Sequence, residues 1–260
     1  LQRCKTGTGR RRMDFFQAED GIRDRSPSRG LGDVYKRQDL TIEKDFNSIF
    51  NQLPIDVFVN RIHNENPLTK ENLLKMRDQI EGITEKILPG EKINTVAYGC
   101  TSGTIAIGEN RVKEKIQLAK PDCYVTTPIT SAIKAFKLMN IKKIAVFTPY
   151  PESVNKTIHE YFSKKNIEVL SFGTFNLDLD SDFANIDPKY LSETLIKLDT
   201  GGADALFISC TALPVLEILD EVEKKINKPV FSSNQTLIWD TIRSVGYKSP
   251  VEGYGKLLRN

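Results

Sequence analysis

The sequence predicts an α/β protein with two pseudo-symmetric parallel-sheet domains and an active site in the cleft between them. From residue 39 onward, short apolar runs alternate with amphipathic helical segments. This alternation is typical of parallel sheets covered by helices on both faces. Two matching strand-end motifs, each containing Cys-Thr, indicate two similar halves. Because ligands of such sheets bind beyond the carboxyl ends of the strands, we expect the active site there.

The individual elements follow from hydrophobic periodicity and from the residues that end each run. The expected strands lie at residues 55–60, 94–98, 123–127, 143–147, 168–172, 205–209 and 229–231. The expected helices lie at residues 69–88, 103–118, 129–139, 152–165, 188–198, 213–226 and 236–245. A loop rich in Asp and Asn precedes the helix at 188–198.

The composition is that of an ordinary globular protein, with 260 residues, 39% hydrophobic and 27% charged. No apolar run approaches the roughly 18 residues that a membrane-spanning helix needs, so we expect no membrane association. No secretory signal is visible, and four cysteines are too few for a disulfide framework in a chain of this length. We therefore expect a cytoplasmic protein with reduced thiols.

Residues 1–38 differ in composition from the rest of the chain. They hold ten of the 37 Lys and Arg residues but only five of the 34 Asp and Glu residues, so the net charge of +3 originates there. The runs at 17–24 (QAEDGIRD) and 28–38 (SRGLGDVYKRQ) resemble translated oligonucleotide adapters from sequencing libraries. We expect an artefactual, disordered segment, because its apolar residues follow no helical or strand period. The alternative is a natural basic arm. Nucleic-acid binding by the body is not expected.

The two strand-end motifs are TVAYGCT at 95–101 and ALFISCT at 205–211. Each places a cysteine, Cys100 or Cys210, between a strand and a predicted helix. At a helix start, the helix dipole and the unpaired backbone N–H groups favour the thiolate over the thiol. Two opposed thiols suit acid–base or nucleophilic chemistry on a small carboxylic acid. The alternative is a pair of buried structural cysteines.

Hydroxyl groups next to the cysteines supply donors for a substrate carboxylate without Arg or Lys. These are the side chains of Thr101, Ser102 and Thr211. Tyr150 ends the turn after the strand at 143–147, where ligands bind, although it could equally cap the strand. The sequence has no Walker loop, no GxGxxG, no HExxH and no zinc-type Cys/His spacing. We therefore expect neither a metal nor a nucleotide cofactor.

Four segments carry a family resemblance: CTSGTIAIGE at 100–109, TPY at 148–150, ALFISCTALP at 205–214 and PVFSSNQTLIW at 229–239. They resemble the aspartate/glutamate racemase superfamily, within it the maleate cis–trans isomerase and arylmalonate decarboxylase branch, and most nearly the ectoine-utilisation proteins. The resemblance implies a first domain of residues 39–127 plus 233–260 and a second of residues 128–232. It also implies that the strand before Asp39 is missing, replaced by the adapter-like sequence.

The resemblance implies roles for particular residues and no cofactor. Cys100 and Cys210 match the two catalytic cysteines of the family. Asp39 stands where the family has Asn in the substrate site. An anionic side chain there would repel a carboxylate, which leaves room for a substrate that bears an ammonium or a cyclic amidine group. The family's carboxylate-binding positions match Thr101, Ser102, Tyr150 and Thr211.

Both cysteines are present, whereas the decarboxylase members of the family keep only the second. We therefore expect a cofactor-independent isomerase or racemase acting on a small carboxylic acid, similar to maleate cis–trans isomerase. An arylmalonate-type decarboxylase, an enzyme of ectoine catabolism and a non-catalytic carboxylate-binding protein remain as alternatives. A homodimer is compatible with the sequence.

Overall fold

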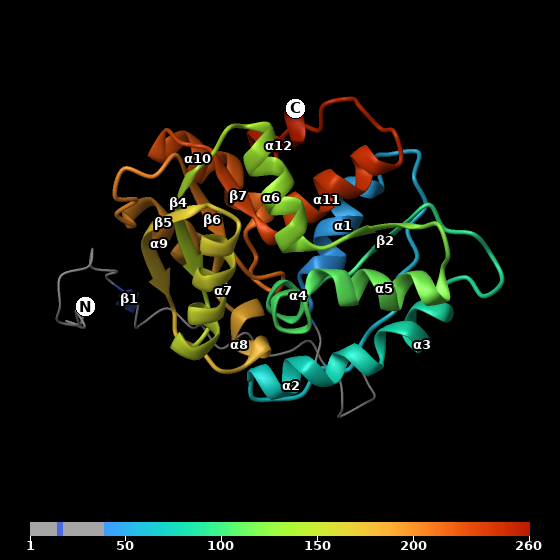
Figure 1. Cartoon of the computed structure of the whole chain (residues 1–260). Coiled ribbons are helices and arrows are strands. Elements are labelled where there is room, and N and C mark those ends of the chain that lie inside the picture. The colour runs from blue at the N-terminus through green and yellow to red at the C-terminus, as the bar shows by residue number, and fades with distance from the viewer. Residues whose placement is uncertain (1–14, 18–38) are drawn as a thin grey trace.

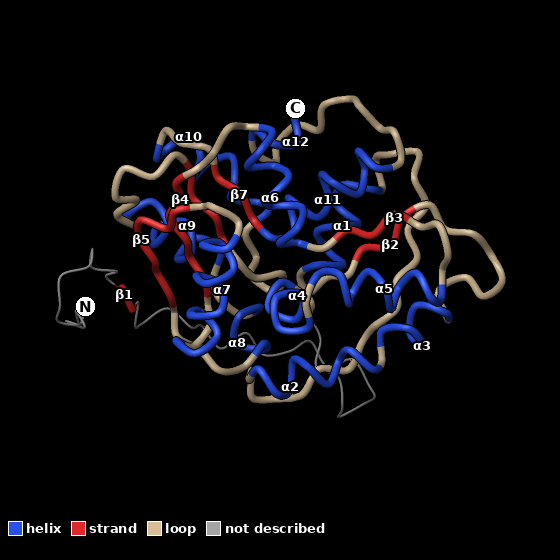
Figure 2. Tube along the Cα trace, in the orientation of Figure 1, coloured by secondary structure: helices blue, strands red, loops and turns tan. Residues whose placement is uncertain are grey.

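The structure is a computed structural model that describes residues 15–17 and 39–260. Its strands form two parallel sheets flanked by helices (Figure 1). The larger sheet has the order β1-β5-β4-β6-β7, and the smaller pairs β2 with β3. The two sheets form separate groups of red segments in Figure 2. The predicted α/β class with parallel sheets is confirmed.

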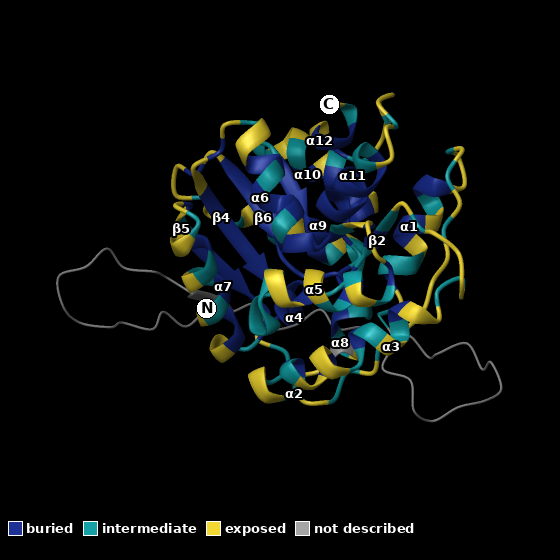
Figure 3. Cartoon of the chain, turned by 45° about the vertical axis from the view of Figure 1, so that its right-hand side comes forward, coloured by how far each residue is buried: buried dark blue, intermediate teal, exposed yellow. Residues whose placement is uncertain are grey.

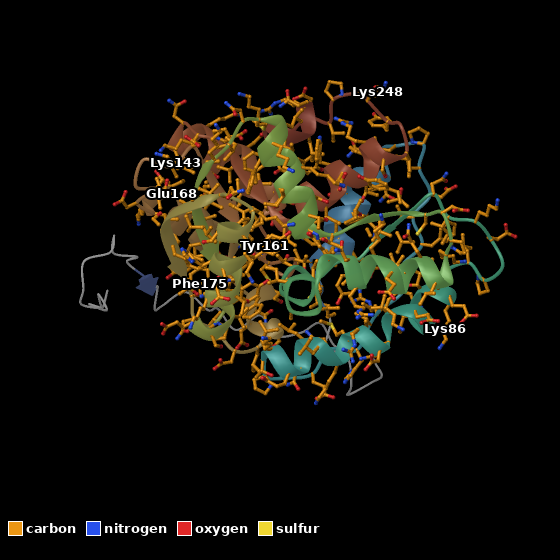
Figure 4. The ribbon with its side chains drawn as sticks, viewed as in Figure 1. Lys86, Lys143, Tyr161, Glu168, Phe175 and Lys248 are labelled. Atoms are coloured by element: carbon orange, nitrogen blue, oxygen red, sulfur yellow. The ribbon has the colours of Figure 1, made fainter. Side chains whose placement is uncertain are left out.

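The strands are short and mostly buried. They are β1 (Phe15–Gln17), β2 (Thr95–Ala97), β3 (Tyr124–Thr126), β4 (Lys143–Thr148), β5 (Glu168–Thr174), β6 (Ala205–Ile208) and β7 (Val230–Ser232). In the larger sheet, β4 and β6 are apolar runs without alternation, as expected for strands covered on both faces (Figure 3). Lys143 and Glu168 are the first residues of β4 and β5, and their Nζ and Oε2 atoms lie 4.0 Å apart (Figure 4). The amino ends of these parallel strands therefore lie together, and so do their carboxyl ends.

Helices flank both sheets. They are α1 (Ile42–Phe50), α2 (Lys70–Lys75), η1 (Met76–Asp78), α3 (Ile80–Glu85), α4 (Thr101–Ile107), α5 (Glu109–Ala119), α6 (Pro128–Leu138), α7 (Glu152–Lys164), α8 (Asp180–Ala184), α9 (Pro188–Lys197), η2 (Leu216–Ile218), α10 (Leu219–Ile226), α11 (Ser233–Ser244) and α12 (Lys256–Arg259). Helix α5 packs against Val96 on one face of the smaller sheet, and α11 contacts Thr95 and Thr126 on the other. Within the described part of the chain, no helix is long and apolar enough to cross a membrane.

Local sequence explains where several helices begin. Thr127 caps α6 by accepting a hydrogen bond from the Thr130 amide, and Pro128 occupies the first turn. Asp187 caps α9 in the same way, again followed by proline. Ser232 caps α11, which leads the chain directly from the end of β7 into a buried helix.

Most of the predicted helices and strands are confirmed. The helix expected at 69–88 is instead the succession α2, η1 and α3, and the sequence analysis did not predict α1 or α12. Three further differences have local causes. The helix expected at 103–118 is two helices, because Gly108 takes a positive φ of 95° between α4 and α5. The loop before residue 188 contains the short helix α8. Residues 55–60 run without strand assignment, contrary to the prediction, because no neighbouring strand pairs with them.

The expectation of an artefactual, disordered segment at 1–38 stays a prediction, and residues 15–17 are the part of this segment that the structure describes. These residues form β1, which pairs in parallel with β5. The outer edge of β5 offers unpaired backbone groups, which will accept an extended segment with little regard to its side chains. The rest of the segment lies outside the described residues. The division into domains at 127/128 and 232/233 stays a prediction. Helix α12 was expected in the first domain, but its Arg259 forms ion pairs with Asp220 and Glu223 of α10, which was expected in the second.

Phe136 of α6 lies at the centre of the core of the larger sheet. Its ring is fully buried and packs edge-on against Phe207 of β6 and Phe231 of β7, with ring centroids 5.7 and 5.1 Å apart. Phe162 of α7 lies 6.1 Å away. These contacts join two helices to two strands that lead to candidate site residues.

We predict that Phe136→Ala lowers the free energy of unfolding by about 3–5 kcal/mol, because it leaves a cavity among three aromatic rings. Chemical denaturation measures the effect. Leu138→Ala, on the same helix but 58% exposed, is the matched control and should cost far less. A loss at Phe136 no larger than at Leu138 would contradict this description of the core.

Candidate functional site

The two predicted cysteine motifs form turns at the carboxyl ends of β2 and β6, and these turns touch. The Thr211 hydroxyl donates a hydrogen bond of 3.3 Å to the carbonyl of Gly99. Thr211 follows Cys210 and Gly99 precedes Cys100, so one bond joins the residues next to the two thiols. Parallel strands from two different sheets thus direct their carboxyl ends at one place.

Cys100 caps the N-terminus of α4. Its Sγ accepts a hydrogen bond from the Gly103 amide at 3.3 Å, and the Ser102 hydroxyl lies 3.9 Å from the sulfur. A backbone N–H directed at sulfur from a helix start is an arrangement that stabilises a thiolate. Cys100 is only partly buried, so the sulfur can meet a ligand.

Gly103 allows this arrangement because a side chain would not fit. A Cβ at this position would lie 2.8 Å from the Cys100 sulfur and 2.6 Å from the terminal methyl group of Met76. Distances this short require a shift of one of the neighbours. The glycine therefore sets how closely the sulfur approaches the helix.

Cys210 differs from Cys100, contrary to the expectation that both start a helix. It lies in a turn after β6, and the next helical residues are those of η2, beginning at Leu216. The Ala212 amide donates to its Sγ at 3.3 Å, and the residue is 4% exposed. The Ala-Leu-Pro sequence after Thr211 explains the delay, because the residue before a proline disfavours helical geometry. Cys210 therefore accepts a hydrogen bond from a nearby amide but does not start a helix.

The candidate carboxylate-binding hydroxyls are placed at the two turns, with partners of their own. The Thr101 hydroxyl exchanges a hydrogen bond of 2.9 Å with Ser233 at the start of α11. Ser102 is buried beside the Cys100 sulfur. Thr211 spans the two turns. Ser102 and Thr211 are thus next to the thiols, whereas Thr101 joins α4 to α11.

Asp39 also contacts the second cysteine turn. Its Oδ1 accepts hydrogen bonds from the amides of Thr41 and Ile42 at 3.0 and 2.9 Å. Burial raises the pKa of its carboxyl group, and this outweighs the hydrogen bonds from Thr211 and from the two amides, which lower it. The carboxylate is therefore easier to protonate than an exposed aspartate.

Tyr150 is buried at the end of β4 and its ring packs edge-on against Phe183 of α8, 5.7 Å between centroids. The Tyr150 carbonyl accepts hydrogen bonds from Asn155 and Thr174. The backbone at this strand end is thereby fixed. The substrate-binding role of Tyr150 stays a prediction.

Sequence reasoning missed a buried polar pair beneath the Cys210 turn. Asn234 of α11 donates from one amide nitrogen to the Asp45 carboxylate and to the Thr211 carbonyl, each at 2.8 Å. Burial raises the pKa of Asp45 to about 7, partly opposed by the bond from Asn234. The sequence signal for this pair is the polar run SSNQ at 232–235. It follows a short apolar run, as Cys-Thr does in the two cysteine motifs.

The described residues contain no group of three His, Cys, Asp or Glu side chains that could hold a metal ion. Cys123 is the third thiol in the part of the chain that the structure describes. It is buried before β3, where burial raises its pKa. Cys4 lies outside the described residues.

Comparison with known proteins places this site in context. The arylmalonate decarboxylase family profile matches residues 108–258. The maleate isomerase of Geobacillus stearothermophilus is 26% identical over 199 residues, which cover 74% of this chain and 79% of that protein.

Solved structures share the fold. The maleate isomerase Iso from Pseudomonas putida S16 superposes with a TM-score of 0.77 at 20% identity, over 85% of this chain and 94% of that one. A cysteine-to-serine variant of Nocardia farcinica maleate cis–trans isomerase, which carries a covalently bound succinylcysteine intermediate, gives a TM-score of 0.76 at 19% identity, with the same coverage of each chain.

We predict that Gly103→Ala lowers both stability and activity, although alanine normally stabilises a helix relative to glycine. The added Cβ must displace the Cys100 sulfur or Met76. Gly82→Ala in α3 is the matched control, because nothing lies within 4 Å of its Cβ. It should gain about 0.5–1 kcal/mol. Thermal unfolding and turnover of both variants check the prediction, and equal behaviour would refute the constraint at Gly103.

We predict that Asp45 makes the chain less stable as the pH rises from about 4 to 7. Its pKa lies near 7 in the folded chain, against an ordinary value of 3.8, so the folded state holds the proton more tightly across this window. Asp45→Asn removes that proton binding, and its free energy of unfolding should fall less over the window.

Chemical denaturation at several pH values measures the slopes. Asp204→Asn is the control, because the amides of Lys142 and Lys143 lower the pKa of Asp204. The stability from Asp204 is present above its ordinary pKa and is lost only at lower pH. Identical slopes for the unaltered chain and Asp45→Asn would contradict the assignment.

Proposed function

The chain belongs to the arylmalonate decarboxylase family, and we propose that it is a cofactor-independent isomerase that converts maleate, or a similar small cis-unsaturated acid, to the trans isomer. The observation that carries the proposal is the contact between the two cysteine turns, made by the Thr211 hydroxyl and the Gly99 carbonyl. Two thiols on adjoining turns, at the ends of strands from two different sheets, could act on the two carbons of one double bond.

Cys100 acts as the nucleophile, since its sulfur caps a helix and is the more accessible of the two. Its thiolate adds to one carbon of the double bond, forming a carbon–sulfur bond. The π electron pair moves to the other carbon, which takes a proton from the Cys210 thiol. The carbon–carbon bond is now single and rotates.

Elimination reverses these steps. The Cys210 thiolate removes the proton it gave, the double bond re-forms in the trans geometry, and the carbon–sulfur bond breaks to release Cys100 as a thiolate. Each atom and electron pair returns to its origin, so the reaction needs no oxidant, reductant or cofactor. Burial of Cys210 suits this role, because it favours the neutral thiol that must donate first.

The substrate carboxylates are held by groups at the two turns. Ser102 and the amides at the start of α4 serve one carboxylate, and Thr211 serves the other, with Tyr150 at the end of β4 as a further donor. Asp39 lies beside Thr211 and opposes a second negative charge unless it is protonated. Its raised pKa is therefore part of how a dicarboxylate is accommodated.

A racemase would use the same two thiols on opposite faces of one carbon. The difference between the two cysteines favours the isomerase, because a racemase that works in both directions needs two groups of similar character. A cytoplasmic location and a homodimeric state stay predictions.

We predict that Cys100→Ser and Cys210→Ser each lower the rate of maleate isomerisation by about two to four orders of magnitude, because each removes a reacting thiol. Cys210→Ala should still form the adduct, which solvent can protonate but no base can then reverse. Intact-mass and peptide measurements should find one maleate added at Cys100.

Cys123→Ala is the control for thiol reactivity and should keep its turnover, since Cys123 is buried before β3. An adduct on Cys123, or turnover that survives Cys100→Ser, would refute the mechanism. A further outcome is that both serine variants lose activity but Cys210→Ala forms no adduct. Cys100 would then not be the nucleophile, and the roles of the two thiols would be reversed.

We predict that the KM for maleate rises with pH through the titration of Asp39, because the anionic form repels the substrate. Asp39→Asn should give a KM that is several-fold lower at high pH and nearly independent of pH. Glu43→Gln, at an acid that pairs with Arg61 instead, should leave the pH dependence in place. A KM that increases in Asp39→Asn would show that the substrate carries a positive group.

A further inference from the structure

Helix α11 contacts both sheets, and Figure 2 shows it between their strands. It continues the chain from β7 of the larger sheet, whose last residue, Ser232, caps the helix. At its other end, the Ser244 hydroxyl shares a hydrogen bond of 2.7 Å with the Thr95 hydroxyl, at the start of β2 in the smaller sheet. Between these points, Thr241 shares one of 3.1 Å with Thr126 of β3. One helix therefore connects the two sheets.

The first turn of α11 contacts the residue that follows each cysteine. Ser233, the first residue of the helix, shares a hydrogen bond of 2.9 Å with the hydroxyl of Thr101, which comes directly after Cys100. The next residue, Asn234, donates a hydrogen bond of 2.8 Å to the carbonyl of Thr211, which comes directly after the second cysteine. Two neighbouring residues of one helix thus contact both cysteine turns.

The pairing of β6 with β7 explains why Asn234 reaches the Cys210 turn. Ile208 and Ser232 are partners in this parallel pair. Cys210 and Asn234 each come two residues after one of these partners. The two chain segments therefore leave the sheet side by side, one as the cysteine turn and the other as the first turn of α11.

Asp45 of α1 fixes the orientation of the Asn234 amide. One nitrogen of Asn234 donates to Asp45 Oδ2 and to the Thr211 carbonyl, each at 2.8 Å. An amide nitrogen carries two hydrogens, so both are engaged. Asp45, Asn234 and Thr211 are 7%, 2% and 7% exposed, so breaking either bond would leave a buried polar group without its partner. The contact between α11 and the Cys210 turn is therefore rigid.

Ser233 fixes the other thiol through α4. Thr101 is the first residue of α4, and the Cys100 sulfur caps the same helix start. Ser233 and Thr101 are 0% and 1% exposed, so their shared hydrogen bond is closed to water. A displacement of this helix start would carry the sulfur with it. Ser233 therefore stands to Cys100 as Asn234 stands to the second thiol.

We infer that Ser233 and Asn234 are positioning residues that set the separation of the two thiols, an inference that rests on the proposed isomerisation. Each acts through the residue after one cysteine, and neither needs to touch the substrate. In that reaction, the two sulfurs must reach neighbouring carbons of one molecule. A misplacement of about 1 Å can lower the rate about a hundredfold. Adjacent residues of one helix hold both turns at once, which the single bond between Thr211 and Gly99 does not.

The two residues affect different steps of the reaction. Ser233 positions the sulfur that adds to the double bond, so its loss slows formation of the adduct. Asn234 positions the group that removes the proton during elimination, so its loss lets the adduct accumulate on Cys100. A role in folding alone would lower stability without this division between steps.

The variant Ser233→Ala tests the contact with the Cys100 turn. It should lower kcat for maleate at least about tenfold and carry less adduct during turnover than the unaltered chain. Proton NMR of fumarate formation and intact mass measure the two effects. Ser131→Ala is the matched control, because Ser131 is also fully buried and donates at 2.8 Å to Asp240, about two turns further along α11. Its kcat should remain close to that of the unaltered chain. An equal loss in the two variants would overturn the role of Ser233.

The double variant Asp45→Asn/Asn234→Asp tests the contact with the Cys210 turn. The exchange keeps an amide and a carboxylate joined, but a carboxylate at position 234 cannot donate to the Thr211 carbonyl. The reference is Asp45→Asn, which still offers Asn234 an acceptor. Relative to this reference, the double variant should lose at least about tenfold in kcat and accumulate adduct on Cys100. Equal kcat values would overturn the role of Asn234.

A second variant keeps this test decisive if the exchanged pair does not fold. Asp45→Leu/Asn234→Leu removes both polar groups, because apolar groups of similar shape can replace a buried polar pair at little cost. The same loss of kcat and the same accumulation of adduct are expected, now relative to the unaltered chain. Undiminished kcat in this folded variant would overturn the role of Asn234.

Carbon-13 labelling of the cysteine Cβ atoms gives a readout that needs no turnover. The signal of Cys100 should shift or split in Ser233→Ala, and that of Cys210 in the Asn234 variants, whereas Cys123 serves as an internal reference. Unchanged signals, or shifted signals with undiminished kcat, would overturn the inference. Shifted signals in variants of a chain that itself makes no fumarate would support the positioning contacts and refute the proposed reaction instead.

Discussion

The hydrogen bond from the Thr211 hydroxyl to the Gly99 carbonyl is the contact on which the candidate site depends. It joins two turns whose cysteines lie 110 positions apart in the sequence and whose strands belong to different sheets. Asn234 supports the same turn from below by donating to the Thr211 carbonyl and to the buried Asp45. The start of α11 therefore fixes the second cysteine against the first. Because strand ends and helix starts hold both turns, the thiols are positioned by rigid elements rather than by loops.

The two thiols have different surroundings, and the proposed reaction uses that difference. Cys100 caps a helix and accepts the Gly103 amide, whereas Cys210 sits buried in a turn that delays its helix until Leu216. A nucleophile and a proton donor need such unlike environments. Asp39 adds a charge whose raised pKa ties substrate binding to pH. The neighbouring carboxylate is thus compatible with an acidic substrate only in its protonated form.

Much of this arrangement could be predicted from residue patterns, because buried parallel strands and amphipathic helices leave clear periodicities. The two Cys-Thr strand ends predicted a shared site before any geometry was known. Patterns could not reveal the contact between Asn234 and Asp45, which joins residues 189 positions apart. They also failed at residues 55–60, whose composition predicts a strand although no partner pairs with them. Strand propensity is realised only beside another strand, so a local pattern does not contain that information. The break between α4 and α5 could not be predicted from the hydrophobic pattern, because it depends on the positive φ that Gly108 adopts.

The central claim is that two thiols on touching turns isomerise a small unsaturated acid without any other reagent. Proton NMR of maleate incubated with a catalytic amount of the chain, with nothing else added, tests it most directly. The account predicts that fumarate accumulates to many equivalents of the protein and that turnover disappears when Cys100 is alkylated beforehand. The contradicting result is a folded chain in which bound maleate protects Cys100 from an alkylating reagent but no fumarate forms. That result would identify a carboxylate-binding protein with the fold of an isomerase.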